Sequence, residues 1–290
     1  LCTGPFCYLK HCRGRPTPMK RAILLVAFGT TAPEAQKVFD IIDAQTRAAF
    51  PDDDIRWAYT SRFVKAKLAK EGKTLDSPEI AMARLMNDGF THVAVLPLLV
   101  MPGEEFHRLH NNVRLFERMT GGFRMVAVAS PLLSIHSDLR RVAEAMRGRI
   151  PSERKPDEPV VFIGHGNARH PSDSLYAAMG FIMQEIDPNI HIGTVSGYPG
   201  MDDVLPRLSV ASGKKAYLAP LMTTAGEHLR NDIAGDGPGS WKSALARIGW
   251  DCRTSFQGMG EHPEIVDVWL DHLRDALARL EGGGKRHGAA

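Results

Sequence analysis

Apolar runs of strand length alternate with amphipathic stretches along almost the whole chain, and this alternation restricts the fold to the α/β class. Several runs are apolar without interruption, which is typical of parallel strands that helices cover on both faces. The predicted strands are Arg21–Phe28, Ile55–Thr60, His92–Leu98, Met125–Ala129, Val160–Ile163, Ile190–Val195, Lys215–Pro220 and Cys252–Phe256. Helical periodicity lies between them at Glu34–Ala49, Ile80–Asp88, Leu139–Arg149 and Ile265–Leu280. We therefore expect mostly parallel sheets with flanking helices.

The two halves of the chain repeat the same motifs in the same order. RAILLVAFGT resembles EPVVFIGHGN, which aligns Phe28 with His165. Farther along, THVAVLPLLVMPGEEFHR resembles KKAYLAPLMTTAGEHLRN and aligns Glu105 with His228. SPLLSIHSDL resembles FQGMGEHPEI in the same way. Because all three pairs occur in the same order, we predict two similar α/β domains, related by internal duplication, that face each other across a cleft.

The polar segment SERKPDEP (residues 152–159) interrupts both periodicities and marks the predicted linker. This places an N-terminal α/β domain at residues 19–151 and a C-terminal α/β domain at residues 152–281. Residues 1–18 show no periodicity and are rich in turn formers, so they are predicted to be a disordered extension before a candidate natural start at Met19. Residues 282–290 are predicted to be a disordered tail.

Composition restricts the cellular compartment and the classes of partner that the protein can have. The net charge of +3 is too small to indicate a nucleic-acid-binding face, although local cations could still hold a small acidic ligand. Three of the four cysteines lie in the first twelve residues, so disulfides do not frame the fold and a reducing compartment is expected. No apolar run approaches the roughly 20 residues that cross a bilayer. We predict a cytoplasmic protein without nucleic acid or membrane as a partner, and leave open whether it forms a homo-oligomer.

Three side chains are the candidates for chemistry at the cleft. His165 stands between two glycines after a buried strand, and His228 follows a strand and the turn at Gly226. Glu105 takes the position of His228 in the other half. Ligands of open α/β sheets gather at the carboxyl ends of strands, which is where these residues fall. Two histidines and a carboxylate are suitable ligands for a transition metal.

Other polar residues have simpler interpretations. His107 and His110 share a helix face away from Glu105 and are expected to be solvated. His136 and His262 each stand at the start of a helix and are expected to cap it locally. A basic run, Arg62, Lys65, Lys67 and Lys70, is either a solvated helix face or a means of attracting a carboxylate-rich ligand. The chain lacks the sequence patterns of zinc peptidases, serine hydrolases and phosphate-binding loops.

Several of these motifs, in this order, resemble the anaerobic cobaltochelatases of the CbiK family. They are VAFGT, the W-x-Y-T-S segment, PGEEFH, GHGN, PLM-x-x-AGEH with NDIAGD, and the Ser-Trp pair at residues 240–241. The resemblance extends from about Met19 to about Leu280. It implies the class II chelatase architecture, in which two flavodoxin-like domains enclose a tetrapyrrole in the cleft between them.

The resemblance also implies a reaction and a set of active residues. His165 and His228 fall on the two active-site histidines of the family, and Glu105 falls on its active-site glutamate; all three are implied to bind the metal. The implied reaction is insertion of Co²⁺ into sirohydrochlorin on the anaerobic route to cobalamin, without an organic cofactor. Some relatives place a metal-binding glutamate where this chain has Ser196. Haem is not expected, because the segment LLVM lacks the histidine that haem-binding relatives carry before PGEEF.

Two other functions fit the same residues. Insertion of iron into sirohydrochlorin, for sirohaem, would use the same cleft, and metal preferences separate cobalt from iron only modestly. A bilobed protein that carries a metal or tetrapyrrole without transforming it would have the same overall shape. Multiple turnover distinguishes an enzyme from such a carrier.

Overall fold

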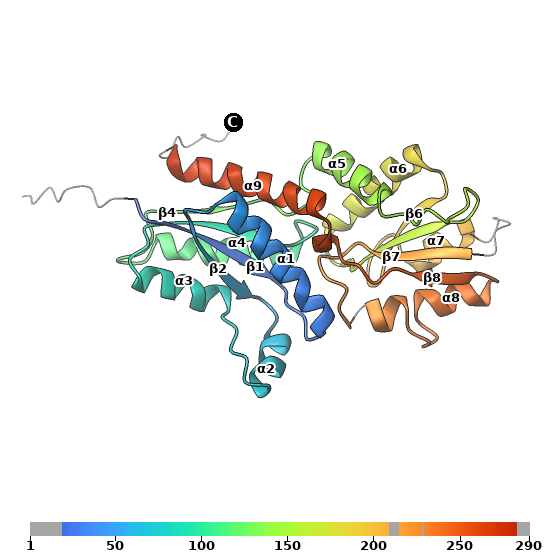
Figure 1. Ribbon diagram of the computed structural model, residues 1–290, viewed down its shortest axis with the longest axis horizontal. Coiled ribbons are helices and arrows are strands. Elements are labelled where there is room, and N and C mark those ends of the chain that lie inside the picture. Colours follow the sequence, from blue (N-terminus) through green and yellow to red (C-terminus); the bar gives the residue numbers. More distant parts are fainter. Residues whose placement is uncertain (1–18, 209–214, 228, 283–290) are drawn as a thin grey trace, which may run out of the picture.

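The strands form two four-stranded, entirely parallel sheets (Figure 1). The computed structural model describes residues 19–208, 215–227 and 229–282. The first sheet contains β1 (Arg21–Ala27), β2 (Asp54–Tyr59), β3 (His92–Pro97) and β4 (Met125–Val128), and the second contains β5 (Val160–Gly164), β6 (Ile190–Thr194), β7 (Lys215–Pro220) and β8 (Asp251–Thr254). Each observed strand overlaps a predicted one, so the α/β class is confirmed.

Both sheets have the same strand order, which confirms the predicted duplication. The first is ordered β2-β1-β3-β4 and the second β6-β5-β7-β8. In the first sheet Leu25 of β1 pairs with Trp57 and Leu96. In the second sheet Phe162 of β5 pairs with Ile192 and Ala219. The first strand of each repeat is thus one of the two inner strands of its sheet.

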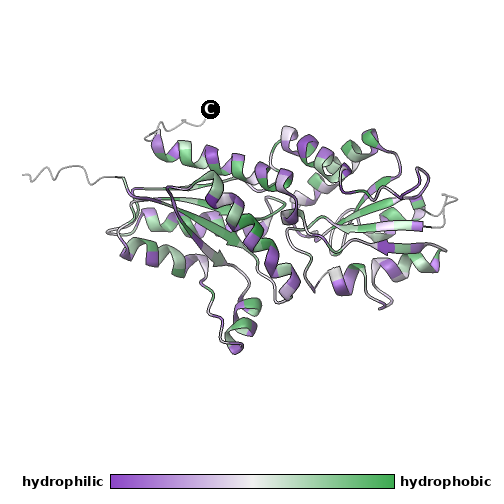
Figure 2. Cartoon of the chain, viewed as in Figure 1, coloured by the Kyte–Doolittle hydropathy of each residue, from purple (hydrophilic) through white to green (hydrophobic). Residues whose placement is uncertain are grey.

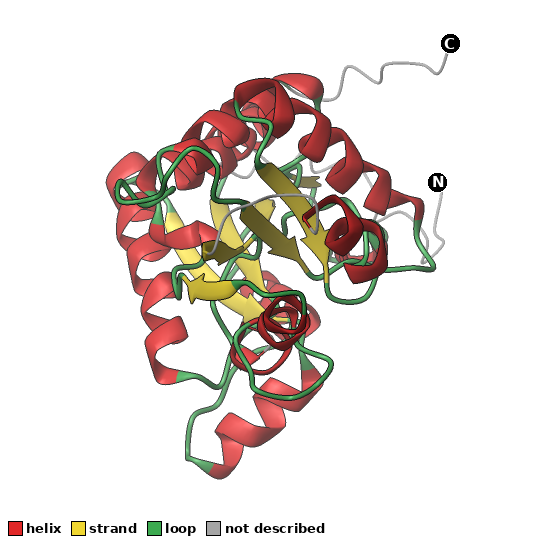
Figure 3. Cartoon of the chain, turned by 90° about the vertical axis from the view of Figure 1, so that its right-hand side faces the viewer, coloured by secondary structure: helices red, strands yellow, loops and turns green. Residues whose placement is uncertain are grey.

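Helices cover both faces of each sheet, and the strands lie between them (Figure 3). Their bounds are α1 (Pro33–Ala49), α2 (Arg62–Lys70), α3 (Pro78–Asn87), α4 (Glu104–Arg114), α5 (His136–Arg147), α6 (Ser174–Ile186), α7 (Met201–Leu208), α8 (Trp241–Arg247) and α9 (Pro263–Glu281). Three of the four predicted helices begin two or three residues earlier than periodicity indicated, as α3 does at Pro78 and α9 at Pro263. Proline suits these first positions because its missing N–H has no intrahelical partner there.

Successive side chains of β1 point to opposite faces of the sheet, and both faces are buried. Ile23 and Leu25 belong to a core that α1 and α9 cover, whereas Leu24 and Val26 belong to a second core under α3 and α4. All four side chains are almost completely buried. Apolar residues are therefore concentrated in the strands, and polar residues lie on the outer faces of the helices (Figure 2).

The last helix of each half covers the other half. Helix α9 packs on β3, β4 and α1 of the first half, and α5 packs against α6 of the second (Figure 1). Arg21 of β1 also forms an ion pair with Glu281 at the end of α9. One core runs through both halves because of this exchange. The linear division at residues 151 and 152 stays a prediction, since the units that pack together are not contiguous in sequence.

No helix in the described part of the chain is both long and apolar enough to span a membrane. The predicted N-terminal extension lies outside the described residues, as does the predicted C-terminal tail except for Gly282.

Candidate active site

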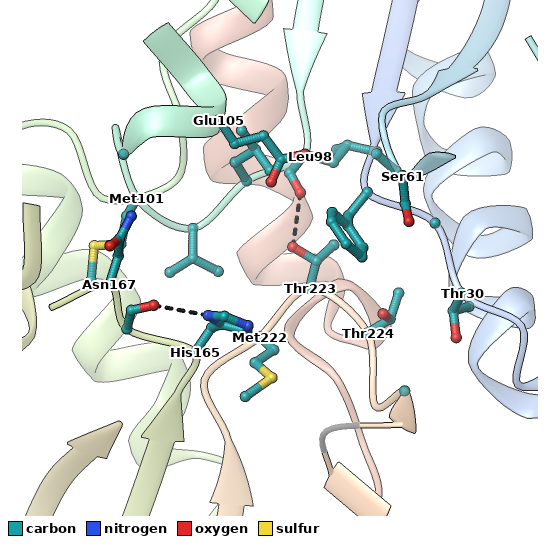
Figure 4. A pocket seen from close by; sticks show the side chains of 18 of the residues that line it. Thr30, Ser61, Leu98, Met101, Glu105, His165, Asn167, Met222, Thr223 and Thr224 are labelled. Carbon is teal, nitrogen blue, oxygen red and sulfur yellow. Dashed lines mark hydrogen bonds between the residues drawn. The ribbon is translucent and has the colours of Figure 1, made fainter. Parts of the chain in front are cut away.

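A cavity of about 720 Å³ lies where the carboxyl ends of the two sheets meet. Segments that follow β1, β2 and β3 line it from one half, and segments that follow β5, β6 and β7 line it from the other. Glu105 and His165 approach it from opposite sides (Figure 4). The hydroxyl of Thr223 donates to the carbonyl of Leu98 at 2.9 Å, which joins the halves beside the cavity. Two of the three predicted site residues therefore line one cavity.

His165 directly follows β5, and the glycines beside it shape the turn. A Cβ on Gly164 would come within 2.3 Å of the ring of Tyr176, so this position needs glycine. Gly166 has a φ of +75°, which side chains with a Cβ rarely adopt. The imidazole Nδ1 lies 2.8 Å from the carbonyl oxygen of Gly166. Because a carbonyl only accepts, Nδ1 carries the proton in the neutral ring and Nε2 presents the lone pair.

A buried carboxylate clamps the loop that carries His165. The two oxygens of Asp173 accept from the backbone N–H of Asn167 at 2.9 and 3.0 Å, and one of them accepts from Tyr198 N–H at 2.9 Å. Asn167 and Tyr198 belong to the loops that follow β5 and β6, respectively. The two loops touch at Gly166 and Gly197, where an added Cβ on either glycine would meet the other loop's backbone at less than 3 Å. No sequence motif indicates this role of Asp173, because its partners come from two separate loops.

Ser196 occupies the loop after β6 and lies beside His165. Its N–H donates to the carbonyl of His165 at 2.8 Å, and its carbonyl accepts from Ala168 N–H at 3.1 Å. The residue also lines the cavity. Ser196 thus lies next to His165 in the cavity lining, and its side chain is a neutral hydroxyl.

Glu105 is the second residue of α4, and its side chain is half-buried. The hydroxyl of Thr60, which follows β2, donates a hydrogen bond to its Oε1. Burial raises the pKa of Glu105, while the bond from Thr60 and the positive charges of Arg108 and His165 act in the opposite direction. The carboxyl is therefore easier to protonate than an ordinary glutamate, and it interacts with His165 through the cavity. Thr60 was not among the predicted site residues.

His228 lies outside the described residues, so its predicted role stays a prediction. The adjacent Glu227 lines the cavity and accepts from the hydroxyl of Thr31 at 3.1 Å. Lys67 forms an ion pair with Glu227 at 3.3 Å. Within the described parts of the chain, no three histidine, cysteine, aspartate or glutamate side chains lie close enough together to hold a metal ion.

Apart from His165, the histidines that the structure describes lie outside the cavity lining. His107 is exposed, as expected, and its ring is 5.5 Å from that of His170. His136 is the first residue of α5, and His262 is the N-cap residue of α9. Neither side chain forms a capping hydrogen bond, so the prediction that they cap these helices is wrong. Burial and the charge of Arg149 instead lower the pKa of His262 to about 4.

Solved chelatases share this architecture. SirB from Bacillus subtilis with Fe³⁺ has a TM-score of 0.63 and 18% identity, over 91% of this chain and 98% of that chain. The sirohydrochlorin chelatase SirB from Bacillus subtilis subspecies spizizenii, in complex with cobalt, has a TM-score of 0.59 and 16% identity over the same shares of the two chains. At these identities the likeness establishes the fold, which is that of the two-domain chelatases.

Sequence comparison defines the family more narrowly. The family model described as cobalt chelatase (CbiK) matches residues 21–278. The sirohydrochlorin cobaltochelatase CbiKC of Nitratidesulfovibrio vulgaris is 38% identical, over 90% of this chain and 92% of that protein. A sirohydrochlorin cobaltochelatase of Salmonella typhimurium is 33% identical, over 89% of this chain and 97% of that protein. The chain belongs to the CbiK family of cobalt chelatases, as its motifs predicted.

Proposed function

We propose that this protein inserts Co²⁺ into sirohydrochlorin in the cavity between its two halves. The observation that carries the proposal is the convergence of His165 and Glu105 on one cavity at the carboxyl ends of both sheets. The names of the two curated relatives support the choice of metal and ring. A cytoplasmic location and assembly into a homo-oligomer stay predictions.

Metal insertion requires a ligand for the incoming ion. The ion must lose water before the ring nitrogens can bind it, so a protein ligand has to hold it meanwhile. The Nε2 lone pair of His165 is suited to Co²⁺, because imidazole is a good ligand for first-row transition metals. Glu105, and His228 by family resemblance, would complete the set. The hydroxyl of Ser196 is a weaker ligand than a carboxylate and is left out of it.

The ring must also lose its two inner N–H protons as the ion enters. The N–H bonds break, the nitrogen electron pairs bind Co²⁺, and the two protons pass to bases beside the ring. Glu105 is such a base, since its raised pKa makes its carboxylate a better proton acceptor than an ordinary glutamate. His165 would take a proton only after it releases the metal, because Nε2 cannot hold both at once.

The wall of the cavity provides apolar surface for the macrocycle. Phe28 and Phe63 line the cavity and are 51% and 67% exposed, respectively. Leu99 and Met222 add aliphatic surface from the two halves. Exposed aromatic side chains of this kind suit a flat, largely apolar ring, which would bury them on binding.

An absorbance assay tests the proposal. Sirohydrochlorin and Co²⁺ are mixed in several-fold excess over the protein, and the metallated product is followed with His165→Ala protein and protein-free buffer as controls. Turnover well beyond one equivalent is expected from the wild type alone. A spectral change that stops at one equivalent would instead establish a carrier. The second candidate function is insertion of iron, since a solved structure of this fold contains Fe³⁺. Repeating the assay anaerobically with Fe²⁺ compares the rates of iron and cobalt insertion.

A further inference from the structure

Acidic groups outnumber basic ones around the cavity. Among the described residues that line it, the acidic ones are Glu104, Glu105, Asp173 and Glu227. Arg108 is the only lysine or arginine in this part of the lining. A ligand that carries carboxylates would therefore meet a predominantly acidic wall, and it needs a cation to be held there.

Most of the acidic side chains are already engaged. Glu105 accepts from Thr60, and Asp173 accepts from the backbone of two loops. Glu227 forms an ion pair with Lys67, so the charge of Lys67 is already balanced by a carboxylate of the protein. These carboxylates already have hydrogen-bond or ion-pair partners and do not require Arg108 as one.

Arg108 itself forms no hydrogen bond or ion pair with the described residues beyond its electrostatic influence on Glu105. Its side chain is exposed at the cavity. Arg114 of the same helix differs, because it pairs with Glu117 at 3.5 Å and does not line the cavity. A guanidinium presents donors in a fork that matches a carboxylate, so Arg108 is available for an anionic ligand in a way that Arg114 is not.

The position of Arg108 on α4 relates it to the reacting centre. It lies three residues after Glu105, so the two side chains share a helix face with Cβ atoms about 5–6 Å apart. If Glu105 serves the ring nitrogens, a long side chain one turn away reaches toward the ring's edge. Sirohydrochlorin carries its carboxylates on that edge.

We propose that Arg108 binds a peripheral carboxylate of the tetrapyrrole and so sets the orientation of the ring in the cavity. The inference rests on the proposed function, from which it takes the chemical class of the ligand. Arg108 is then a substrate-binding residue that contributes affinity and selectivity for carboxylate-bearing rings. It holds the ground state and the transition state equally, because the carboxylate does not react.

The alternative is that Arg108 acts only through Glu105, whose pKa its charge lowers. The two roles differ in kinetics. Loss of a uniform binding contact raises KM and leaves kcat unchanged, whereas a change in the proton acceptor alters kcat.

The experiment compares Arg108→Gln, Arg108→Lys and the matched control Arg114→Gln, which removes the same charge from the same helix. Binding of metal-free sirohydrochlorin is titrated by absorbance at pH 8 over a series of salt concentrations, and Co²⁺ insertion is measured in parallel. Arg108→Gln should raise both Kd and KM on the order of tenfold at low salt, with kcat within about twofold of wild type. It should also flatten the salt dependence of Kd. Arg108→Lys should recover part of the affinity, and Arg114→Gln should match the wild type.

Two outcomes overturn the inference while the proposed function stands: Arg108→Gln behaving like Arg114→Gln, or a fall in kcat without a change in Kd. If the wild type binds sirohydrochlorin in an Arg108-dependent way but stops at one equivalent of product, the inference holds and the chelatase function fails. If the wild type does not bind sirohydrochlorin at all, both fail.

Discussion

At the residue scale, His165 and Glu105 line one cavity and have different proposed roles: His165 binds the metal, and Glu105 also accepts a proton. The Nδ1–H of His165 donates to the carbonyl of Gly166, and Nε2 is the atom proposed to bind the metal. Burial raises the pKa of Glu105, which prepares its carboxylate to accept a proton. Ser196 stands beside them with only a hydroxyl. These differences predict how strongly substitution of each residue lowers the rate of Co²⁺ insertion.

His165→Ala and His228→Ala should each lower the rate of Co²⁺ insertion by about 100-fold or more, because each removes a proposed metal ligand. Glu105→Gln should fall between these and the wild type, since it keeps the shape but loses the charge. Ser196→Ala should retain most of the activity. Rates are compared side by side for variants whose circular dichroism shows that they are folded. A loss in Ser196→Ala as large as in either histidine variant would contradict the proposed ligand set.

Asp173 should matter through position rather than through contact with substrate. Asp173→Asn loses the charge that holds three hydrogen bonds from two loops, so we expect Co²⁺ affinity and kcat to fall about 10-fold with little change in KM for the ring. Asp138→Asn is the control. Asp138 is equally buried and accepts from Ile135 N–H, but it lies outside the cavity. Equal activity in the two variants, at matched stability, would assign Asp173 a purely structural role.

The raised pKa of Glu105 predicts an acid limit on the reaction. As pH falls through that pKa the carboxyl takes up a proton, so it no longer accepts one from the ring. The rate should therefore decline at a higher pH than the value of about 4.3 for an ordinary glutamate would give. Removing the cation in Arg108→Gln should move the decline to still higher pH. A profile of kcat against pH that is the same in wild type and Glu105→Gln would count against this role.

At the element scale, α9 connects the two halves, because it belongs by sequence to the second half and packs on the first sheet. Trp269 lies in its N-terminal half. The side chain is fully buried, and its indole N–H donates to the carbonyl of Leu99 at 3.2 Å. Leu99 lines the cavity, so the same contact supports its wall.

Trp269→Ala should lower the free energy of unfolding by about 3–5 kcal/mol, since it leaves a large void in a closely packed core. Urea titration of the variant measures the loss. Phe181→Ala is a suitable control, because that side chain is 69% exposed and its removal should change stability by less than about 1 kcal/mol. A small loss in Trp269→Ala would show that α9 contributes little to the first sheet.

At the scale of the whole molecule, the exchange of α5 and α9 makes the two halves depend on each other. One continuous core includes Leu25 of the first sheet and Phe162 of the second. Arg230 and Glu34 form an ion pair at 2.8 Å between the halves. Two domains joined only by a flexible linker would lack such a shared core.

We therefore expect the halves to unfold together. Trp57 of β2 reports on the first sheet, and Trp241 of α8 is buried in the core of the second. Variants in which either Trp57 or Trp241 is the only remaining tryptophan, with Trp250 and Trp269 replaced by phenylalanine in both, should give coincident urea midpoints by fluorescence, and the same midpoint by circular dichroism. Two separated midpoints would show that each half folds independently in spite of the exchanged helices.

Local pattern was enough to determine the class of fold, the duplication and the family. Strand and helix periodicities depend on neighbouring residues, and repeated motifs such as those around Phe28 and His165 can be compared within the chain. The same logic placed His165 and Glu105 at the cleft, because the carboxyl ends of parallel strands meet at one edge.

Tertiary structure alone decided which side chains support those residues. Thr60 and Glu105 are 45 positions apart, and Asp173 joins two loops that periodicity treats separately. The side of the molecule that α9 covers was equally undetermined, since an amphipathic helix needs an apolar face to pack on but does not specify which one. Arg108 stood out only when the charges around the cavity could be counted, because distance in space, not spacing in the chain, determines which charges are neutralised.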